Sequence, residues 1–373
     1  MLYRASEGSN DLVVQVLYVK PNSPASAAGL QRGDLISRIN NQTLTVDNYR
    51  DILGQMNEPF TILYKELNEE TQQFGGIKEV SLSVVEYAEN PNFLHQVYTY
   101  NDRKVGYYVY NLFATGPSSN STAYNDEMDQ IFANFKAQGV TDLVIDLRYN
   151  SGGAESATRN LASLIGKGVG SDKIFSKRQY NADVEKAIKE DPTLGPNFLL
   201  VKFTDKAANI GAQLRNSRVY ILTGSRSASA SELLINGLRP YMDVFLIGNK
   251  TVGKNVGSIS LYEENDAKNT WGMQPIVTKS FNSLDQSDYD NGFNPQILDA
   301  DNSVFLYPLG DPRERLLNRA LKEITGLPDI GRVKEGPGMG DVIDHSLDHK
   351  RSSNILNLDL AIPIQNQIRK RLE

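Results

Sequence analysis

The strongest constraint on the fold is an alternation of apolar runs and helical repeats that begins at Val105. The segment Tyr124–Gly139 has apolar residues on one helical face, and Ala154–Ile165 predicts a second helix. Four short runs are apolar enough to form buried strands: Val105–Phe113, Thr141–Tyr149, Ser217–Gly224 and Asp243–Gly248. Strands that alternate with helices in this way indicate an α/β fold.

The first 87 residues instead predict a small β domain. A helical turn is expected at Ala25–Ala28, ended by Gly29, and a helix over Asn48–Met56, capped by Asp47. The expected strands are Asp11–Val19, Leu35–Asn40, Phe60–Glu66 and Glu79–Tyr87. We therefore expect one domain at 1–87 and a different one after it.

Polar segments mark the expected boundaries. Residues 88–104 contain Pro91 and several Asn and Asp, and predict a linker. A polar stretch at about 167–216, with one helical piece at Ala182–Glu190, predicts a surface insertion or lid inside the second domain. Glycines after Pro328 predict an irregular extension. The expected second domain is thus 105–327, followed by an extension at 328–373.

Composition excludes several functional classes. A formal net charge of -6 argues against a nucleic-acid partner, which would favour a basic face. The chain has no cysteine, so disulfides, thiolate zinc sites and cysteine nucleophiles are excluded. The apolar runs are far shorter than the roughly 20 residues that span a bilayer. No basic-then-apolar leader follows Met1, so we expect a soluble chain with any export signal outside this sequence.

Three serines alternate with alanines at Ser227, Ser229 and Ser231 in the run "SRSASASELLINGL". Such small residues let a backbone turn pack tightly, or they present one hydroxyl to a substrate. A Ser–His–Asp triad is not favoured, because none of the three histidines follows a buried strand. They are His95, His345 and His349. The last two have the spacing of a metal pair on a helix, but a solvated tail is the favoured interpretation.

Lysine is an alternative base for a serine nucleophile. A neutral amine can accept the hydroxyl proton when burial lowers its pKa. Lys254, in the run "IGNKTVGKNVGS", follows a buried strand and has glycine and valine neighbours, whereas Lys250 is expected to be more solvated. A surface lysine on a glycine loop is the competing interpretation.

The run "SPASAAGLQRGDLISRIN" (Ser23–Asn40) resembles a bacterial PDZ domain. PDZ domains bind a peptide C-terminus as an added strand and hold its carboxylate in a backbone loop. The resemblance implies that this loop precedes the strand Met1–Ala5, outside the sequence. A small β domain that serves only as a spacer is the alternative.

Residues 105 to about 325 resemble the peptidase domain of the carboxyl-terminal processing proteases, which are PDZ-containing Ser–Lys endopeptidases. Three motifs carry the resemblance: "DLRYNSGG" (Asp146–Gly153), "SRSASASELLINGL" (Ser225–Leu238) and "IGNKTVGKNVGS" (Ile247–Ser258). By position, the family nucleophile falls on Ser229 and the family base on Lys254. The Ser229 hydroxyl would stand where a strand enters a helix, a place where backbone N–H groups favour developing negative charge.

The resemblance also implies supporting groups. The backbone N–H of Ala230 is expected to bind the oxyanion, together with an N–H from the turn at Gly152 and Gly153. Glu232 matches a family glutamate near the site and is expected to orient the lysine or to cap the helix. Ser258 stands where relatives often carry a glutamine, which leaves the third member of the site open.

The resulting expectation is a serine endopeptidase with a crotonase/ClpP-like ββα peptidase domain behind a PDZ domain. It would act on protein or peptide substrates in the periplasm or on an envelope anchor, without metal or cofactor and without nucleic acid. The sequence does not indicate its oligomeric state. The alternatives are a catalytically silent, PDZ-containing peptide-binding or scaffold protein, and an acyl-CoA-type crotonase relative, which Ser229 paired with Lys254 does not fit.

Overall fold

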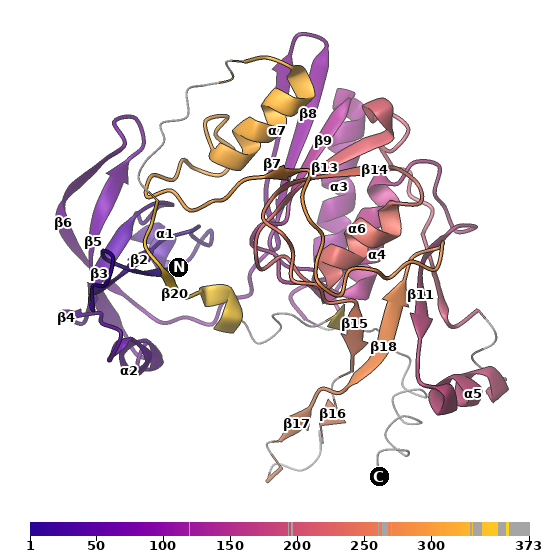
Figure 1. Cartoon of the computed structure of the whole chain (residues 1–373), viewed down its shortest axis with the longest axis horizontal. Coiled ribbons are helices and arrows are strands. Elements are labelled where there is room, and N and C mark those ends of the chain that lie inside the picture. Colours follow the sequence, from indigo (N-terminus) through magenta and orange to yellow (C-terminus); the bar gives the residue numbers. More distant parts are fainter. Residues whose placement is uncertain are drawn as a thin grey trace. The chain divides into compact units, whose positions relative to one another are not determined.

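The computed structural model describes residues 1–118, 120–192, 194, 197–259, 261–262, 268–269, 271–328, 330, 338–349 and 356–357 (Figure 1). The chain divides into two compact units. The first comprises Met1–Glu89 and Ala300–Lys350, and the second comprises Asn90–Asp299 and Arg351–Glu373. Each unit has its own hydrophobic core.

The first unit is built on an antiparallel sheet with the strand order β20-β1-β2-β3-β5-β6, in which β4 also pairs with β3. Its strands are β1 (Leu2–Arg4), β2 (Leu12–Gln15), β3 (Leu35–Ile39), β4 (Gln42–Thr43), β5 (Phe60–Asn68), β6 (Gln73–Leu82) and β20 (Val342–Asp344). Its helices are α1 (Pro24–Ala27), α2 (Tyr49–Gly54), α7 (Arg315–Thr325) and the 3-10 turn η2 (Ser346–His349). The order of elements in the first 87 residues agrees with the sequence prediction.

A buried arginine explains why residues 300–350 belong to the first unit. The Arg32 guanidinium donates to the Asp301 carboxylate at 2.9 Å and to the Tyr307 carbonyl oxygen at 2.9 Å, and it lies 3.5 Å from the Glu314 carboxylate. Buried charges must be paired in this way to be tolerated. The chain rejoins the first unit at Ala300, whereas the sequence analysis expects the second domain to end at 327.

The second unit contains two sheets of six strands. The first has the order β19-β14-β13-β9-β8-β7, parallel except for the β7–β8 hairpin. Its strands are β7 (Asn92–Tyr100), β8 (Arg103–Tyr110), β9 (Asp142–Asp146), β13 (Arg218–Thr223), β14 (Asp243–Gly248) and β19 (Ile297–Leu298). The four buried strands expected from the sequence thus form the centre of this sheet as β8, β9, β13 and β14.

The second sheet has the order β10-β21-β15-β18-β11-β12. Its strands are β10 (Gly153–Ala154), β11 (Ile174–Gln179), β12 (Leu200–Lys202), β15 (Val256–Ser258), β18 (Ile276–Phe281) and β21 (Leu356–Asn357). A separate hairpin pairs β16 (Leu261–Tyr262) with β17 (Gly272–Met273).

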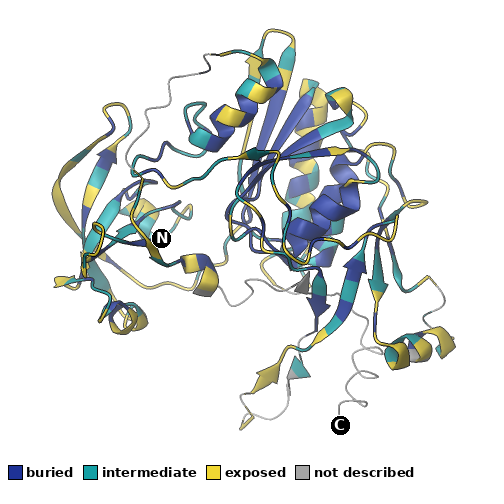
Figure 2. Ribbon diagram, viewed as in Figure 1, coloured by how far each residue is buried: buried dark blue, intermediate teal, exposed yellow. Residues whose placement is uncertain are grey.

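The helices of the second unit are α3 (Ala123–Gln138), α4 (Glu155–Ile165), α5 (Ala182–Glu190) and α6 (Ala230–Leu238), with the 3-10 turn η1 (Arg215–Ser217). Helix α6 contacts α4, β14 of the first sheet, and β11 and β18 of the second. All nine residues of α6 are buried (Figure 2). The two sheets therefore hold α6, and the turn that precedes it, in a fixed position.

The polar segments contain strands that the sequence analysis does not predict. The expected linker 88–104 contains β7, because Asn101 adopts φ 53° and with Asp102 closes a tight hairpin in which Tyr100 pairs with Arg103. The expected insertion 167–216 contributes β11 and β12 to the second sheet. The expected extension, 328–373, whose first residues lie largely outside the described part of the chain, contributes β20 to one unit and β21 to the other.

Two smaller expectations also differ. Asp47 does not cap α2; its carboxylate accepts a hydrogen bond from Asn10, and Asn48 occupies the cap position. His345 is not solvated but 3% exposed, and its Nδ1 accepts the N–H of Leu347 at 3.0 Å. The side chain of His349 lies outside the described residues.

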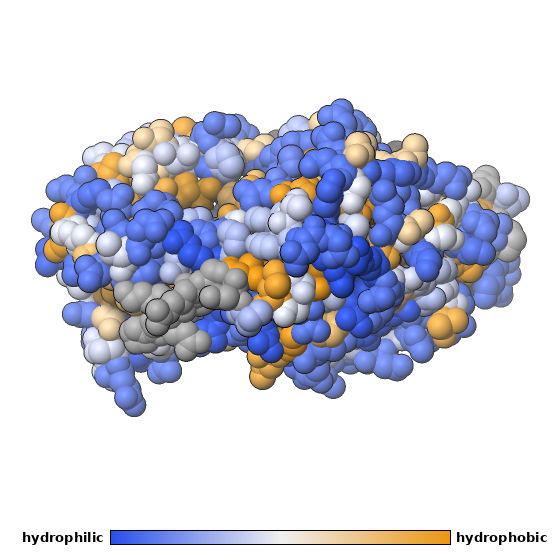
Figure 3. All heavy atoms as spheres, turned by 90° about the horizontal axis from the view of Figure 1, so that it is seen from above, coloured by the Kyte–Doolittle hydropathy of each residue, from blue (hydrophilic) through white to orange (hydrophobic). Residues whose placement is uncertain are grey.

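The molecular surface agrees with the acidic, polar composition. Hydrophilic side chains predominate on the face shown in Figure 3, with smaller groups of apolar ones between them. In the part of the chain that the structure describes, no helix has the length and apolar character needed to cross a bilayer.

Candidate active site

Ser229 lies in the turn between β13 and α6, directly before the first residue of the helix. Its backbone has φ 57° and ψ -109°, a conformation that a residue with a side chain rarely adopts. Such conformations cost about 1–3 kcal/mol and persist at functional sites where the surrounding structure enforces them. The strain at Ser229 is therefore an independent sign of function.

The hydroxyl groups of the three alternating serines have different surroundings. The Ser227 hydroxyl donates to the Leu147 carbonyl oxygen at 2.7 Å, and the Ser231 hydroxyl donates to the Asn150 carbonyl oxygen at 3.0 Å. The Ser229 hydroxyl is buried and has no hydrogen-bond partner among the described residues. Ser227 and Ser231 thus anchor the turn to the loop after β9, and Ser229 is left for chemistry.

The buried Glu232 carboxylate connects the turn at Ser229 to the loop at Lys254. One of its oxygens accepts the backbone N–H of Ser229 at 2.8 Å and that of Lys254 at 2.7 Å. The other accepts the Gly253 N–H at 2.6 Å and the Thr251 hydroxyl at 2.6 Å. Burial raises the pKa of Glu232, and these four hydrogen bonds oppose the rise. We call this arrangement the Glu232 clamp.

Lys254 is the better candidate of the two lysines for a base. It is half-buried, whereas Lys250 is exposed. Burial lowers the pKa of the Lys254 amine from its ordinary 10.5, and the Glu232 carboxylate partly offsets this. A lowered pKa increases the fraction of neutral amine, which is the form that accepts a proton. The Ser229 hydroxyl makes no hydrogen bond to this amine, so the two side chains are not engaged with each other in this structure.

The glycine turn expected to bind an oxyanion lies against the serine. Gly152 has φ 119°, and a Cβ atom there would lie 2.8 Å from the Ser229 Cβ and 3.2 Å from the Ala230 nitrogen. Only glycine allows this approach. The Gly152 N–H donates to the Asn150 side-chain oxygen at 2.9 Å, so that N–H is already engaged. Gly153, the next residue, has φ 136° and begins β10.

The other candidate residues divide into two groups. Ser258 lies on β15, four residues after the lysine, and its buried hydroxyl has no partner among the described residues. His95 lies on β7 with its ring edge-on to Phe135, and it makes no bond to the Ser229 hydroxyl. The structure thus brings Ser229, Glu232, Gly152 and the Lys254 backbone together and leaves His95 out of the cluster.

Sequence reasoning missed two residues that hold the site. Asn150 fixes the Gly152 N–H, and Thr251 completes the Glu232 clamp while its hydroxyl accepts the Phe293 N–H at 2.7 Å. Both lie inside motifs noted in the sequence. Their position in those motifs was the available signal. Asn150 is only two residues from Gly152, whereas the partners of Thr251 are distant in sequence.

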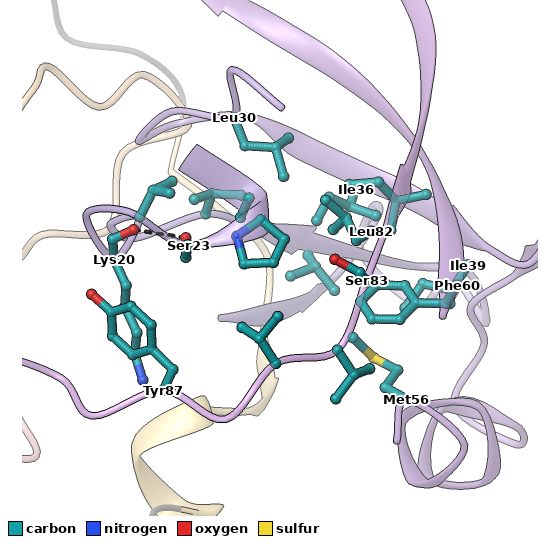
Figure 4. A pocket seen from close by; sticks show the side chains of 18 of the residues that line it. Lys20, Ser23, Leu30, Ile36, Ile39, Met56, Phe60, Leu82, Ser83 and Tyr87 are labelled. Atoms are coloured by element: carbon teal, nitrogen blue, oxygen red, sulfur yellow. Dashed lines mark hydrogen bonds between the residues drawn. The ribbon is translucent and has the colours of Figure 1, made fainter. Parts of the chain in front are cut away.

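The first unit offers separate candidate binding sites. A cavity of about 620 Å³ is lined mainly by apolar side chains (Figure 4), and at its rim the Ser23 hydroxyl donates to the Lys20 carbonyl oxygen at 2.7 Å. A second cavity, of about 530 Å³, is lined by residues of β1, α2 and the β20–η2 segment. The edge of β1 away from β2 is paired with β20, with Leu2 opposite Asp344 and Tyr3 opposite Val342.

Comparison with known proteins identifies relatives for both units. A model of the Peptidase family S41 matches residues 104–297, and a model of the PDZ domain matches residues 15–66. The "Probable CtpA-like serine protease" of Staphylococcus aureus (strain COL) is 24% identical over 249 residues, covering 65% of this chain and 42% of that protein. Its namesake in Staphylococcus haemolyticus (strain JCSC1435) is 22% identical over 248 residues, with the same coverage.

A crystal structure assigned to the S41 proteases, from Bacteroides fragilis NCTC 9343, is 29% identical with a TM-score of 0.69 and covers 87% of this chain and 81% of that one. The chain spans less than half the length of the two staphylococcal relatives. These matches confirm the α/β class, the PDZ domain ahead of a ClpP/crotonase-like domain, and the resemblance on which those expectations rested.

Proposed function

This chain belongs to peptidase family S41, and on that premise we propose that it is a serine endopeptidase of the carboxyl-terminal processing type. Ser229 is the nucleophile and Lys254 the general base. The single observation that carries this assignment is the Glu232 clamp, because one buried carboxylate fixes the backbone N–H groups of both residues. The clamp holds the nucleophile and the base at a constant backbone separation, which an acyl-transfer site requires.

The proposed reaction has two halves. The Ser229 oxygen attacks the scissile carbonyl carbon while the neutral Lys254 amine takes the hydroxyl proton. The tetrahedral oxyanion is held by the Ala230 N–H and by an N–H of the turn at Gly152 and Gly153. Lys254 then returns the proton to the leaving amine as the acyl-serine forms. In the second half, Lys254 takes a proton from a water molecule, which attacks the acyl carbonyl carbon; the proton passes to the Ser229 oxygen as the acid is released. In the described arrangement the Ser229 hydroxyl makes no hydrogen bond to the Lys254 amine, so the two groups have to approach before the reaction begins.

The first unit has a supporting part in this proposal. Its PDZ domain recognises peptide substrates or regulates the peptidase, since PDZ domains bind extended peptides. The proposed substrates are proteins or peptides, and the resemblance supports a site of action outside the cytoplasm, in the periplasm or on the cell envelope. A catalytically silent scaffold is the second candidate, and the unengaged side chains of Ser229 and Lys254 favour it.

Hydrolysis of an unfolded protein separates the two candidates. We expect the purified chain to degrade casein unfolded by reduction and alkylation, and to be labelled by a fluorophosphonate serine probe that also stops the degradation. The measurement is the release of acid-soluble peptides, with probe-treated protein as the control. If the protein shows no degradation of casein and no labelling at any pH tested, the result would favour the scaffold instead.

The pH dependence of the reaction tests the role of Lys254. Only the neutral amine accepts a proton, and burial lowers its pKa in the folded protein below 10.5. We therefore expect kcat/KM to rise with pH and to reach half its maximum below pH 10.5. The measurement is kcat/KM for an internally quenched peptide over the stability range of the protein. A rate that falls as pH rises through neutrality would contradict a lysine base.

A further inference from the structure

Strand β21 joins two parts of the second sheet that are otherwise separate. In the order β10-β21-β15-β18-β11-β12 it lies between β10 and β15 and is parallel to both. Leu356 is opposite Gly153 on one side and Gly257 on the other, and Asn357 is opposite Ala154 and Ser258. Without β21, a gap one strand wide would separate β10 from β15, about 9.6 Å across at the usual strand spacing of about 4.8 Å.

Both walls of this one-strand gap begin beside proposed catalytic residues. β10 starts directly after Gly152, the residue that packs against Ser229. β15 starts two residues after Lys254. A chain segment in the gap therefore passes between the proposed oxyanion turn and the strand that follows the proposed base.

The gap suits an extended peptide of almost any sequence. Its walls would offer unpaired backbone N–H and C=O groups, which an added strand satisfies. The wall residues opposite β21 are small: Gly153, Ala154, Gly257 and Ser258. Small residues on both sides would contact the backbone of a ligand and would not select among its side chains. An unfolded polypeptide is therefore the ligand that fits the gap.

We propose that β21 occupies the substrate's place in this gap and acts as a tethered competitor of the substrate, a proposal that rests on the proposed function. The state of the active site is consistent with an occupied gap. The Ser229 hydroxyl is buried without a partner, and the Gly152 N–H is turned to Asn150. Substrate enters when the Leu356–Asn357 segment leaves, and the enzyme is slow while the segment stays.

Tethering makes a weak competitor effective. A segment that belongs to the same chain as its binding site acts at an effective concentration that can be on the order of millimolar. A segment with a dissociation constant about tenfold below that value would lower kcat/KM about tenfold. Removing it should raise kcat/KM by the same factor.

The test replaces one backbone donor of β21. Asn357→Pro removes an N–H from a strand that is paired on both sides, a position that proline does not occupy. Asn357→Ala keeps the N–H and is the matched control. We expect kcat/KM for an internally quenched peptide to rise about tenfold in Asn357→Pro and to stay low in Asn357→Ala. Equal kcat/KM in wild type and Asn357→Pro would overturn the proposal.

A second measurement does not depend on activity. In the Ser229→Ala background, Asn357→Pro should speed hydrogen exchange in fragments that contain residues 153–154 and 256–258. A synthetic peptide of residues 351–373 should restore the protection, and the same peptide with proline at position 357 should not. Unchanged exchange in the proline variant would overturn the proposal even if both forms hydrolyse peptides. A third outcome is possible, in which hydrogen exchange changes as expected but no form of the protein is labelled by the probe or hydrolyses peptides. That outcome would count against the proposed peptidase and not against occupancy of the gap.

Discussion

Replacement of Ser229 by alanine is expected to reduce casein hydrolysis at least 10³- to 10⁴-fold and to abolish labelling by a fluorophosphonate probe, as losses of this size follow removal of a nucleophile. Lys254→Ala should cause a similar loss, because Lys254 is the group proposed to take the serine proton. Both variants should remain folded, since neither side chain makes a hydrogen bond among the described residues that alanine would break.

The neighbouring lysine supplies the control for this result. Lys250→Ala removes an exposed amine four residues before Lys254 and should leave hydrolysis within about twofold of wild type, as surface changes usually do. Thermal unfolding of each variant checks its fold. Full labelling of Ser229→Ala or full hydrolysis by Lys254→Ala would remove the dyad from consideration.

Replacement of Glu232 by glutamine is expected to have the second-largest effect, because it disrupts the Glu232 clamp in either orientation of the amide. One carboxylate oxygen accepts from the Ser229 and Lys254 N–H groups and the other from Gly253 and Thr251, so an NH₂ group must face one of these pairs. A buried donor left unsatisfied costs about 1–3 kcal/mol. We expect unfolding by urea to report a loss of about 2–4 kcal/mol and kcat/KM to fall at least tenfold.

The pH profile distinguishes this role from simple loss of stability. The Glu232 carboxylate raises the pKa of the Lys254 amine, so a neutral glutamine should lower that pKa further and move the acidic limb of kcat/KM to lower pH. Thr251→Ser keeps the hydroxyl that donates to Glu232 and should leave both stability and the profile close to wild type. An unshifted profile in Glu232→Gln would mean that the carboxylate is structural only.

The sequence predicted the parts of the site that depend on local pattern. Buried strands have apolar runs, and the helix that ends at Leu238 begins with small residues. The bounds of β13, α6 and β14 could therefore be predicted to within a residue or two. Ser229 could be chosen only through family resemblance. The separate partners of Ser227 and Ser231, which give a physical reason for that choice, come from the loop after β9 and have no local signature.

The remaining features depend on contacts between distant residues. The polar stretch around β11 looked like an insertion because only alternate residues of a sheet strand need be apolar, yet Phe175 and Phe203 are buried in the core. The positive φ of Ser229, whose N–H is held by Glu232, cannot be read from residue types. Strands β20 and β21 are two or three residues long and become strands only by pairing with β1, β10 and β15.

The pairing of β20 with β1 bears on the proposed binding of peptides by the PDZ domain. A strand with a neighbour on each side has no backbone groups left for a newcomer, so a peptide can add to β1 only by strand displacement. The incoming peptide must then replace what Ile343 contributes by packing on the domain core. The apparent affinity for the peptide equals the intrinsic affinity multiplied by the fraction of time that β20 is released. The domain would therefore bind only peptides that outcompete the chain's own strand.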